Sequence, residues 1–165
     1  MNMAPNYQWK TFPARKDGND MSEQNKATAK RIFDAWNARD LDVFDEVIAA
    51  DAIDHDPQNP HAEVHGPAAL RRQVEMYLAA FPDTRMLVNE QFAEGDFVLT
   101  RWTASGTNQG PLMGMPATGK PVVIAGMTVN RFQTDGKIGE SWANWDTLGM
   151  LQQLGVIPAA QSTSA

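Results

Sequence analysis

Apolar residues recur at helical spacing through the first half of the chain. A helix is predicted from Ser22, whose hydroxyl suits an N-cap, to about Arg39. A second, short helix is predicted to follow a cap at Asp40, and a third to run from about Pro67 to Phe81, with Pro67 in its first turn. The apolar stripes of these helices are Ala29, Ile32, Phe33 and Trp36, then Leu41, Phe44, Val47 and Ile48, then Leu70, Val74, Tyr77, Leu78 and Phe81.

The second half alternates with a period of two. Four strands are predicted near residues 84–92, 96–105, 121–133 and 137–146, with turns at Glu94-Gly95-Asp96 and Asp135-Gly136-Lys137. Helices followed by consecutive antiparallel strands predict an α+β domain, not a parallel βαβ repeat.

The predicted strands are apolar on both faces. The third carries Val123, Ala125, Met127 and Val129 on one side and Val122, Ile124 and Phe132 on the other. Such a sheet needs cover on each side, which we expect to be helices or a cavity on the concave face and another subunit on the convex face. A long helix could also fill the concave side completely.

The last predicted strand ends at Asp146. On a strand from Lys137 to Asp146, side chains alternate between two faces. One face carries Ile138, Glu140, Trp142, Asn144 and Asp146, and the other carries Ser141, Ala143 and Trp145. The first face offers an indole, a carboxamide and a carboxylate, which suit a pocket that binds a flat organic molecule and moves a proton. Asp146 also directly precedes a short amphipathic helix, whose free N–H groups it could cap without any chemistry. The sequence leaves both roles open.

Composition narrows the class of protein. At 165 residues with 42% hydrophobic content, the chain is long enough for one domain with a real core. It has no cysteine, which excludes disulfides, thiolate metal sites and a cysteine nucleophile. A net charge of −6 with scattered basic residues argues against a nucleic-acid partner. Without an apolar run of roughly 18 residues or a signal-peptide core, we expect a cytoplasmic protein with no membrane partner.

Three zones are expected along the chain. Residues 1–21 read as a flexible or docking extension, residues 22–157 as the folded domain, and residues 158–165 as a tail.

The histidines cluster in one predicted loop, and acidic residues surround them. The members of this cluster are His55, His61, His65, Asp54, Asp56 and Glu63. Their spacing is not that of a helix-borne ligand pair, and the prolines between them indicate an extended lid, so no metal is expected.

Two other features have alternative interpretations. Arg101 could orient an acidic or carbonyl group, but a salt bridge to Glu90 or Glu140 on a neighbouring strand is the more ordinary explanation. The methionines could adapt to an irregular apolar ligand or simply pack the core and loops; they are Met113, Met115 and Met127.

Five segments together resemble the SnoaL-like polyketide cyclases. They are AIDHDP at 52–57, FPDTRMLVNEQFAEGDFVLTRWTASGTNQG at 81–110, GMPATGK at 114–120, RFQTDGKI at 131–138 and ESWANWDTLGMLQQLG at 140–155. The resemblance covers residues 22–157. It implies a nuclear-transport-factor-2-like cone, in which a curved antiparallel sheet wraps around N-terminal helices and a central pocket, and it implies homodimers or homotetramers. It also implies ring closure by intramolecular aldol condensation without a cofactor, with Asp146 as the acid/base.

The chain departs from this family at two positions. Asn108 and Ser141 stand where members commonly carry histidine, and both can still donate and accept hydrogen bonds. An aldol needs a carboxylate with a raised pKa, which burial beside aromatic residues provides, and donors for a developing oxyanion. The expected catalytic residues are Asp146 and His55, although a histidine between two aspartates is more often solvated or salt-linked. The expected substrate-binding residues are Trp36, Arg101, Asn108, Met127, Trp142 and Asn144.

The resulting hypothesis is a cofactor-independent cyclase or isomerase acting on a hydrophobic carbonyl compound. One alternative is an epoxide-hydrolase-like hydrolase, which would use two carboxylates and an arginine around one water; Arg101, Asp146 and Glu140 are the candidates. The other is a pocket that binds a small ligand without catalysis.

Overall fold

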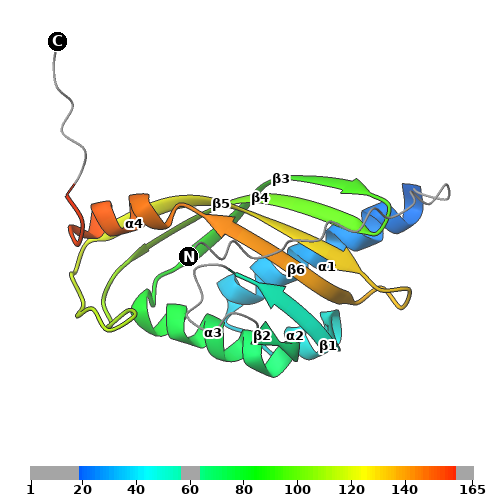
Figure 1. The fold of residues 1–165 in the computed structure, drawn as a ribbon, viewed down its shortest axis with the longest axis horizontal. Helices are drawn as coiled ribbons and strands as arrows, with labels where there is room; N and C mark the ends of the chain where they lie inside the picture. Colours follow the sequence, from blue (N-terminus) through cyan, green and yellow to red (C-terminus); the bar gives the residue numbers. More distant parts are fainter. Residues whose placement is uncertain (1–18, 57–63, 159–165) are drawn as a thin grey trace, which may run out of the picture.

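A six-stranded sheet organises the fold (Figure 1), which the computed structural model describes over residues 19–56 and 64–158. Its strands lie in the order β2-β1-β6-β5-β4-β3, and all neighbours are antiparallel except the parallel pair β1 and β6. The strands are β1 (Ile48–His55), β2 (Val64–His65), β3 (Arg85–Glu94), β4 (Phe97–Thr107), β5 (Pro121–Phe132) and β6 (Ile138–Trp145). The helices are α1 (Asn19–Ala38), α2 (Val43–Val47), α3 (Gly66–Ala80) and α4 (Thr147–Leu154). The predicted α+β class is confirmed.

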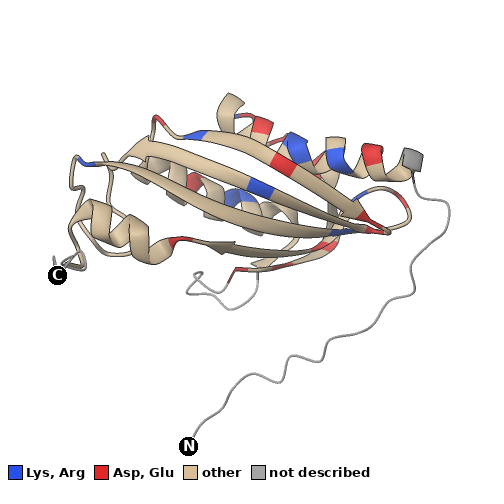
Figure 2. Cartoon of the chain, turned by 90° about the horizontal axis from the view of Figure 1, so that it is seen from above, with Lys and Arg blue, Asp and Glu red and all other residues tan. Residues whose placement is uncertain are grey.

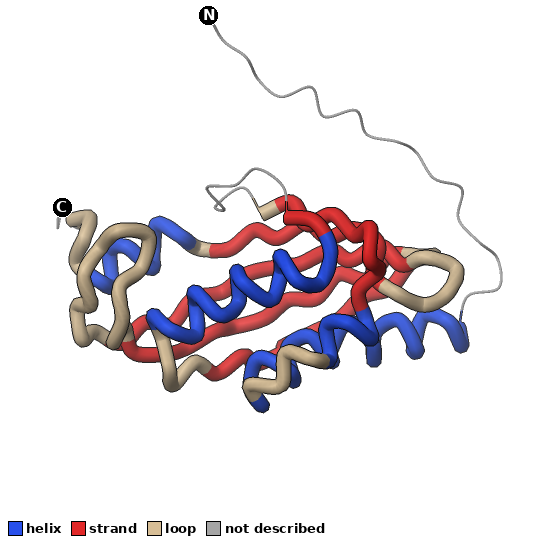
Figure 3. The backbone as a smooth tube through the Cα atoms, turned by 90° about the horizontal axis from the view of Figure 1, so that it is seen from below, coloured by secondary structure: helices blue, strands red, loops and turns tan. Residues whose placement is uncertain are grey.

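The long helices α1 and α3 cover one face of the sheet, as Figure 3 shows from below. α1 packs on β3 and β4, α3 packs on β1, and α4 packs on β5. The predicted stripe of α1 faces inward, with Ala29 and Phe33 buried and Trp36 partly buried. The charged residues lie mainly on the helices and near strand ends, and most of the strand surface is free of them (Figure 2). No helix in the described part of the chain is long and apolar enough to cross a membrane.

The predicted helix boundaries need three corrections. The first helix begins at Asn19, not at Ser22. The N-cap position of α2 is Asp42, not Asp40, and its side chain makes no capping bond. Ile48 begins β1 and does not belong to the second helix. The third helix and Pro67 in its first turn are confirmed. Most of the predicted extension and tail lies outside the described residues.

The two predicted hairpin turns are confirmed. Gly95 joins β3 to β4 with φ of 57°, and Gly136 joins β5 to β6 with φ of 81°. Both values lie in the left-handed region, which glycine adopts without the strain that a Cβ would cause.

A β-bulge near the start of β6 decides which side chains face the helices. Phe132 of β5 pairs with Ile138, but Arg131 pairs with Glu140, so Gly139 is an extra residue on β6. Because side chains alternate along a strand, one extra residue moves every later side chain to the other face. Ile138 and Ser141 therefore lie on the same, helix-covered side.

Candidate active site

A cavity of about 180 Å³ lies between the helix-covered face of the sheet, α1 and α3. Its walls are mostly apolar and rich in aromatic rings, which come from α1, α3 and the strands β4 and β6. The aromatic lining residues include Phe33, Trp36, Tyr77, Phe81, Trp102 and Trp145. Such walls suit a flat, largely apolar ligand.

Asp54 places a carboxyl group in this apolar cavity. Alternation along β1 directs Ala52 and Asp54 to the cavity, and Asp56, just after the strand, also lines it. Burial raises the pKa of Asp54 from 3.8 to about 7, with a further rise from the negative charge of Asp56 and an opposing effect from His55. A carboxyl with that pKa is present in both protonation states near neutral pH, as a general acid or base requires.

A row of polar side chains crosses the sheet beside Asp54. Asp54 on β1 pairs in register with Ser141 on β6, and Ser141 pairs with Asn130 on β5. The Asn130 Nδ2 donates to Ser141 Oγ at 2.8 Å. The hydroxyl proton of Ser141 thus stays available to an acceptor on the cavity side.

The opposite wall, on α3, also carries polar groups. Gln73 Nε2 donates to Asp56 Oδ2 at 3.1 Å, and Asp56 is only 5% exposed. One turn later on α3, the centroid of the Tyr77 ring lies 6.2 Å from that of Trp36. It also lies 6.2 Å from the ring centroid of Trp145, and these two rings meet edge to face. Burial, and secondarily the charge of Asp56, raises the pKa of the Tyr77 hydroxyl above its ordinary value.

Asp146 does not line the cavity, so its predicted position is wrong. It is exposed, and its Oδ1 accepts a hydrogen bond from the Gly149 N–H at 2.7 Å, which makes it the N-cap of α4. The alternative reading of this residue as a cap is confirmed. Trp142 and Asn144 share its side of β6 and also do not line the cavity. The predicted grouping of these three residues on one side is thus confirmed, but that side is the outer one; the bulge at Gly139 separates only Ile138 from them.

His55 lies on the outer face of the sheet, where it belongs to a polar cluster. Its Nε2 lies 3.0 Å from Glu140 Oε1, and its ring stacks on Trp142 at 5.4 Å. Arg131 bridges to the other oxygen of Glu140 at 2.6 Å. His55 is therefore paired with an acidic side chain, as its more ordinary interpretation predicted, and it does not line the cavity.

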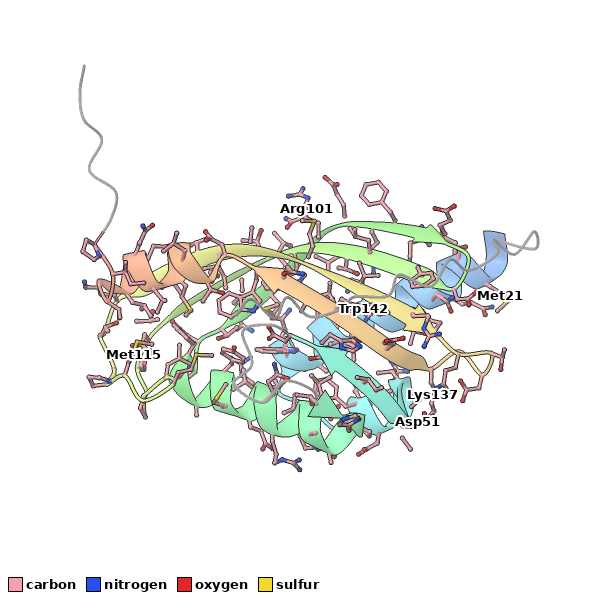
Figure 4. All side chains as sticks on the ribbon, viewed as in Figure 1. Met21, Asp51, Arg101, Met115, Lys137 and Trp142 are labelled. Carbon is pink, nitrogen blue, oxygen red and sulfur yellow. The ribbon has the colours of Figure 1, made fainter. Side chains whose placement is uncertain are left out.

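Of the six predicted substrate-binding residues, only Trp36 lines the cavity. Arg101 projects from the outer face of the sheet (Figure 4). Its guanidinium forms a salt bridge with Glu90 Oε1 at 2.8 Å, which confirms the predicted pairing with an acid on a neighbouring strand. Met127 is half exposed on the same face as Arg101. Asn108 is buried for a structural reason: its amide donates to Gly110 O at 2.8 Å and accepts from Thr118 N at 2.8 Å, which holds the loop after β4.

Three cavity residues were not among the predicted site residues: Asp54 and Asp56, which flank His55, and Tyr77 on α3. The signal that could have found the two aspartates is the spacing D-x-D itself. On a strand this spacing puts both carboxylates on one face, but the segment was interpreted as a loop.

The described residues do not assemble a metal site. Within 19–56 and 64–158, no three His, Asp or Glu side chains are grouped as ligands, and His61 and Glu63 of the histidine cluster lie outside these ranges.

The chain resembles known proteins over most of its length. The profile of the SnoaL-like polyketide cyclases matches residues 26–154. The aklanonic acid methyl ester cyclase of Streptomyces peucetius is 30% identical over 129 residues, which are 76% of this chain and 87% of that protein. The corresponding cyclase of Streptomyces sp. (strain C5) is 30% identical over 134 residues, 76% of this chain and 78% of that protein.

Solved structures agree in fold. IdmH of Streptomyces antibioticus superposes with a TM-score of 0.71 at 33% identity, covering 80% of this chain and 99% of that one. A SnoaL-like protein of Jannaschia sp. CCS1 superposes with a TM-score of 0.76 at 25% identity. The match covers 87% of this chain and 100% of that one. The expected nuclear-transport-factor-2-like cone is thereby confirmed. With its sequence match spanning the sheet, the cavity and α4, the chain belongs to the SnoaL-like polyketide cyclase family.

Proposed function

We propose that this protein is a cyclase that closes a ring in a hydrophobic, carbonyl-rich small molecule, with Asp54 as the acid/base. The observation that carries the proposal is a carboxyl group with a pKa of about 7 in the wall of an aromatic-lined cavity. Apolar surroundings make this carboxylate a stronger base than an aspartate in water, which is what abstraction of a carbon-bound proton needs.

The proposed reaction is an intramolecular aldol addition. The Asp54 carboxylate takes a proton from a carbon next to a carbonyl group, and the resulting enolate carbon attacks a second carbonyl carbon of the same molecule. A carbon–carbon bond forms, and the electron pair of the second C=O bond moves to its oxygen. This alkoxide then recovers the proton from Asp54. All atoms stay in the product, so substrate and product have the same mass.

The charge of the cavity favours a neutral substrate. Its described lining contains Asp54 and Asp56 but no Lys or Arg, so an anionic ligand would be repelled without compensation. The two cyclases that this chain resembles act on a methyl ester, in which a carboxylic acid is masked. The epoxide-hydrolase-like alternative loses support, because Arg101 is paired with Glu90 on the outer face.

The first experiment tests the reaction class. The purified chain, without added cofactor, is incubated with aklanonic acid methyl ester and with smaller aromatic diketo esters, and the products are analysed by liquid chromatography and mass spectrometry. We expect a new compound of unchanged mass. A product that gains one oxygen atom would instead indicate hydroxylation, and a lack of conversion across the set at stoichiometric enzyme would contradict the proposal.

A matched pair of variants tests the assignment of the base. Asp54→Asn removes the carboxylate from the cavity and should lower kcat by roughly 100-fold or more. Asp146→Asn makes the same chemical change at the exposed cap and should leave kcat within about threefold of the wild type, because Asn caps a helix about as well as Asp. The reverse pattern would restore Asp146 as the acid/base and reject Asp54.

A further inference from the structure

Two polar atoms in the wall of the cavity are buried without a hydrogen bond. They are the hydroxyl oxygen of Tyr77 and the Oε1 of Gln73, and neither has a partner among the residues that the structure describes. Both residues line the cavity. Buried polar atoms are nearly always paired in folded proteins, so two unpaired atoms in the wall of one cavity require an explanation.

The position of these residues on α3 directs both side chains to the cavity from one face of the helix. Gln73 and Tyr77 are four residues apart, so their side chains stand one above the other on the same face of the helix. The Gln73 amide also has a fixed orientation. Its Nε2 donates to Asp56 Oδ2 at 3.1 Å, so the oxygen, an acceptor, is the atom that remains for a ligand.

Tyr77 offers the complementary group. Because burial and the nearby charge of Asp56 raise the pKa of its hydroxyl, Tyr77 stays protonated throughout the neutral range and can donate. Packing alone does not explain the hydroxyl. Its ring contacts with Trp36 and Trp145 would be made equally well by phenylalanine.

We propose that Tyr77 and Gln73 form a subsite for one hydroxyl group of the substrate. The oxygen of that hydroxyl accepts from Tyr77, and its proton is donated to Gln73 Oε1, so a single group satisfies both orphaned atoms. A carbonyl, ether or ester oxygen could satisfy only Tyr77, because it has no proton to give.

This subsite narrows the substrate class. The inference rests on the proposed function, in that the same cavity holds the substrate of Asp54. The ligand is then a hydroxylated aromatic ketone, with a phenol or enol hydroxyl directed at α3 and its ring against the aromatic walls of the cavity. α3 packs on β1, the strand that carries Asp54, and Gln73 bonds to Asp56, so the hydroxyl is held on the same side of the cavity as Asp54.

Binding of two matched probes tests the subsite without requiring turnover. The probes are 6-hydroxy-1-tetralone and 1-tetralone, which differ only by the hydroxyl, and binding is followed by isothermal calorimetry on the full chain. The wild type should prefer the hydroxylated probe by about tenfold or more, because the other leaves two buried groups unpaired. Equal affinities, or no binding of either probe at millimolar concentration, would overturn the proposal.

Tyr77→Phe identifies the group responsible. This variant should reduce the preference for the hydroxylated probe to within about threefold and leave the affinity for 1-tetralone unchanged. Its melting temperature should not fall, because the lost hydroxyl made no bond within the protein. A lower melting temperature with an unchanged preference would mean that the hydroxyl serves the fold, and would reject the subsite.

Asp54→Asn separates this inference from the proposed function. The variant should keep the preference for the hydroxylated probe while turnover of the cyclisation substrate falls. If turnover survives but the preference is as expected, only the role of Asp54 is wrong. If the preference is absent but turnover falls, only the hydroxyl subsite is wrong.

Discussion

At the scale of single residues, Asp54 and Asp146 show how position decides the chemistry of one residue type. Asp146 is exposed and accepts a backbone hydrogen bond at the N-terminus of α4. Asp54 is surrounded by apolar walls and a second carboxyl group, which both oppose its charge. Sequence context favoured Asp146 because a Trp and an Asn precede it with the right spacing. Burial, which the local sequence does not reveal, favours Asp54.

The raised pKa of Asp54 has a consequence for stability. A carboxyl with a pKa of 3.8 in the unfolded chain and about 7 in the folded one binds a proton more tightly when folded. Its stabilising contribution is therefore complete below about pH 4 and is lost as pH rises through 7, with an upper limit of about 4 kcal/mol. Asp54→Asn, which cannot ionise, should be increasingly more stable than the wild type from pH 4 to pH 8.

Chemical denaturation at several pH values measures this difference. The other carboxylates are common to both proteins, so the difference between the two unfolding free energies isolates residue 54. Asp146→Asn is the matched control, and its difference from the wild type should not grow with pH in the same direction. A constant offset between Asp54→Asn and the wild type would show that Asp54 titrates normally.

At the scale of elements, most of the fold could be predicted from the sequence. The helical spacing of apolar residues predicted the three helices α1, α2 and α3, and the turns at Gly95 and Gly136 predicted two hairpins. These signals are local, so a single sequence contains them. β1 was missed, since its alternation is short and carries charged residues on both faces, and its pairing partner β6 is more than 80 residues away along the chain.

The candidate site could not be predicted as reliably, because it depends on which face of β6 the helices cover. The bulge at Gly139 arises from the pairing of β6 with β5, which involves contacts that sequence periodicity does not report. Once the bulge is present, Ser141 and Trp145 face the cavity and Trp142 and Asp146 do not. The sequence grouped these side chains correctly by face, but the choice of the face with Trp142 and Asp146 as the cavity wall was wrong.

The cap of α4 gives a prediction at this scale. Asp146→Ala removes the acceptor for the Gly149 N–H and should lower the free energy of unfolding by about 1 kcal/mol, whereas Asp146→Asn should lower it by a few tenths at most. Thermal or urea unfolding followed by circular dichroism measures both. Equal losses for the two variants would mean that the negative charge, and not the hydrogen bond, supports the helix.

At the scale of the whole molecule, the outer face of the sheet carries large exposed apolar residues beside its charged pairs. One row of side chains crosses five strands in register: Phe92, Leu99, Val129, Trp142 and His55. Four large apolar residues of β3 and β5 are at least half exposed on the single chain, namely Leu87 at 62%, Phe92 at 62%, Val123 at 59% and Met127 at 50%. Figure 2 shows few charged residues along these strands. An apolar face of this extent is unusual for a monomer and typical of an interface.

We therefore expect the chain to form a homodimer, or a larger assembly, through the outer face of its sheet. Multi-angle light scattering at micromolar concentration should report at least twice the monomer mass of 18.2 kDa. Met127→Lys places a charge in the middle of this face and should shift the distribution toward the monomer, because the ammonium group would lose its water at the interface. Ala27→Lys, which adds the same charge at an exposed position of α1, should leave the mass unchanged. A wild-type protein that is monomeric under these conditions would contradict the expectation, and so would a Met127→Lys variant that associates as strongly as Ala27→Lys.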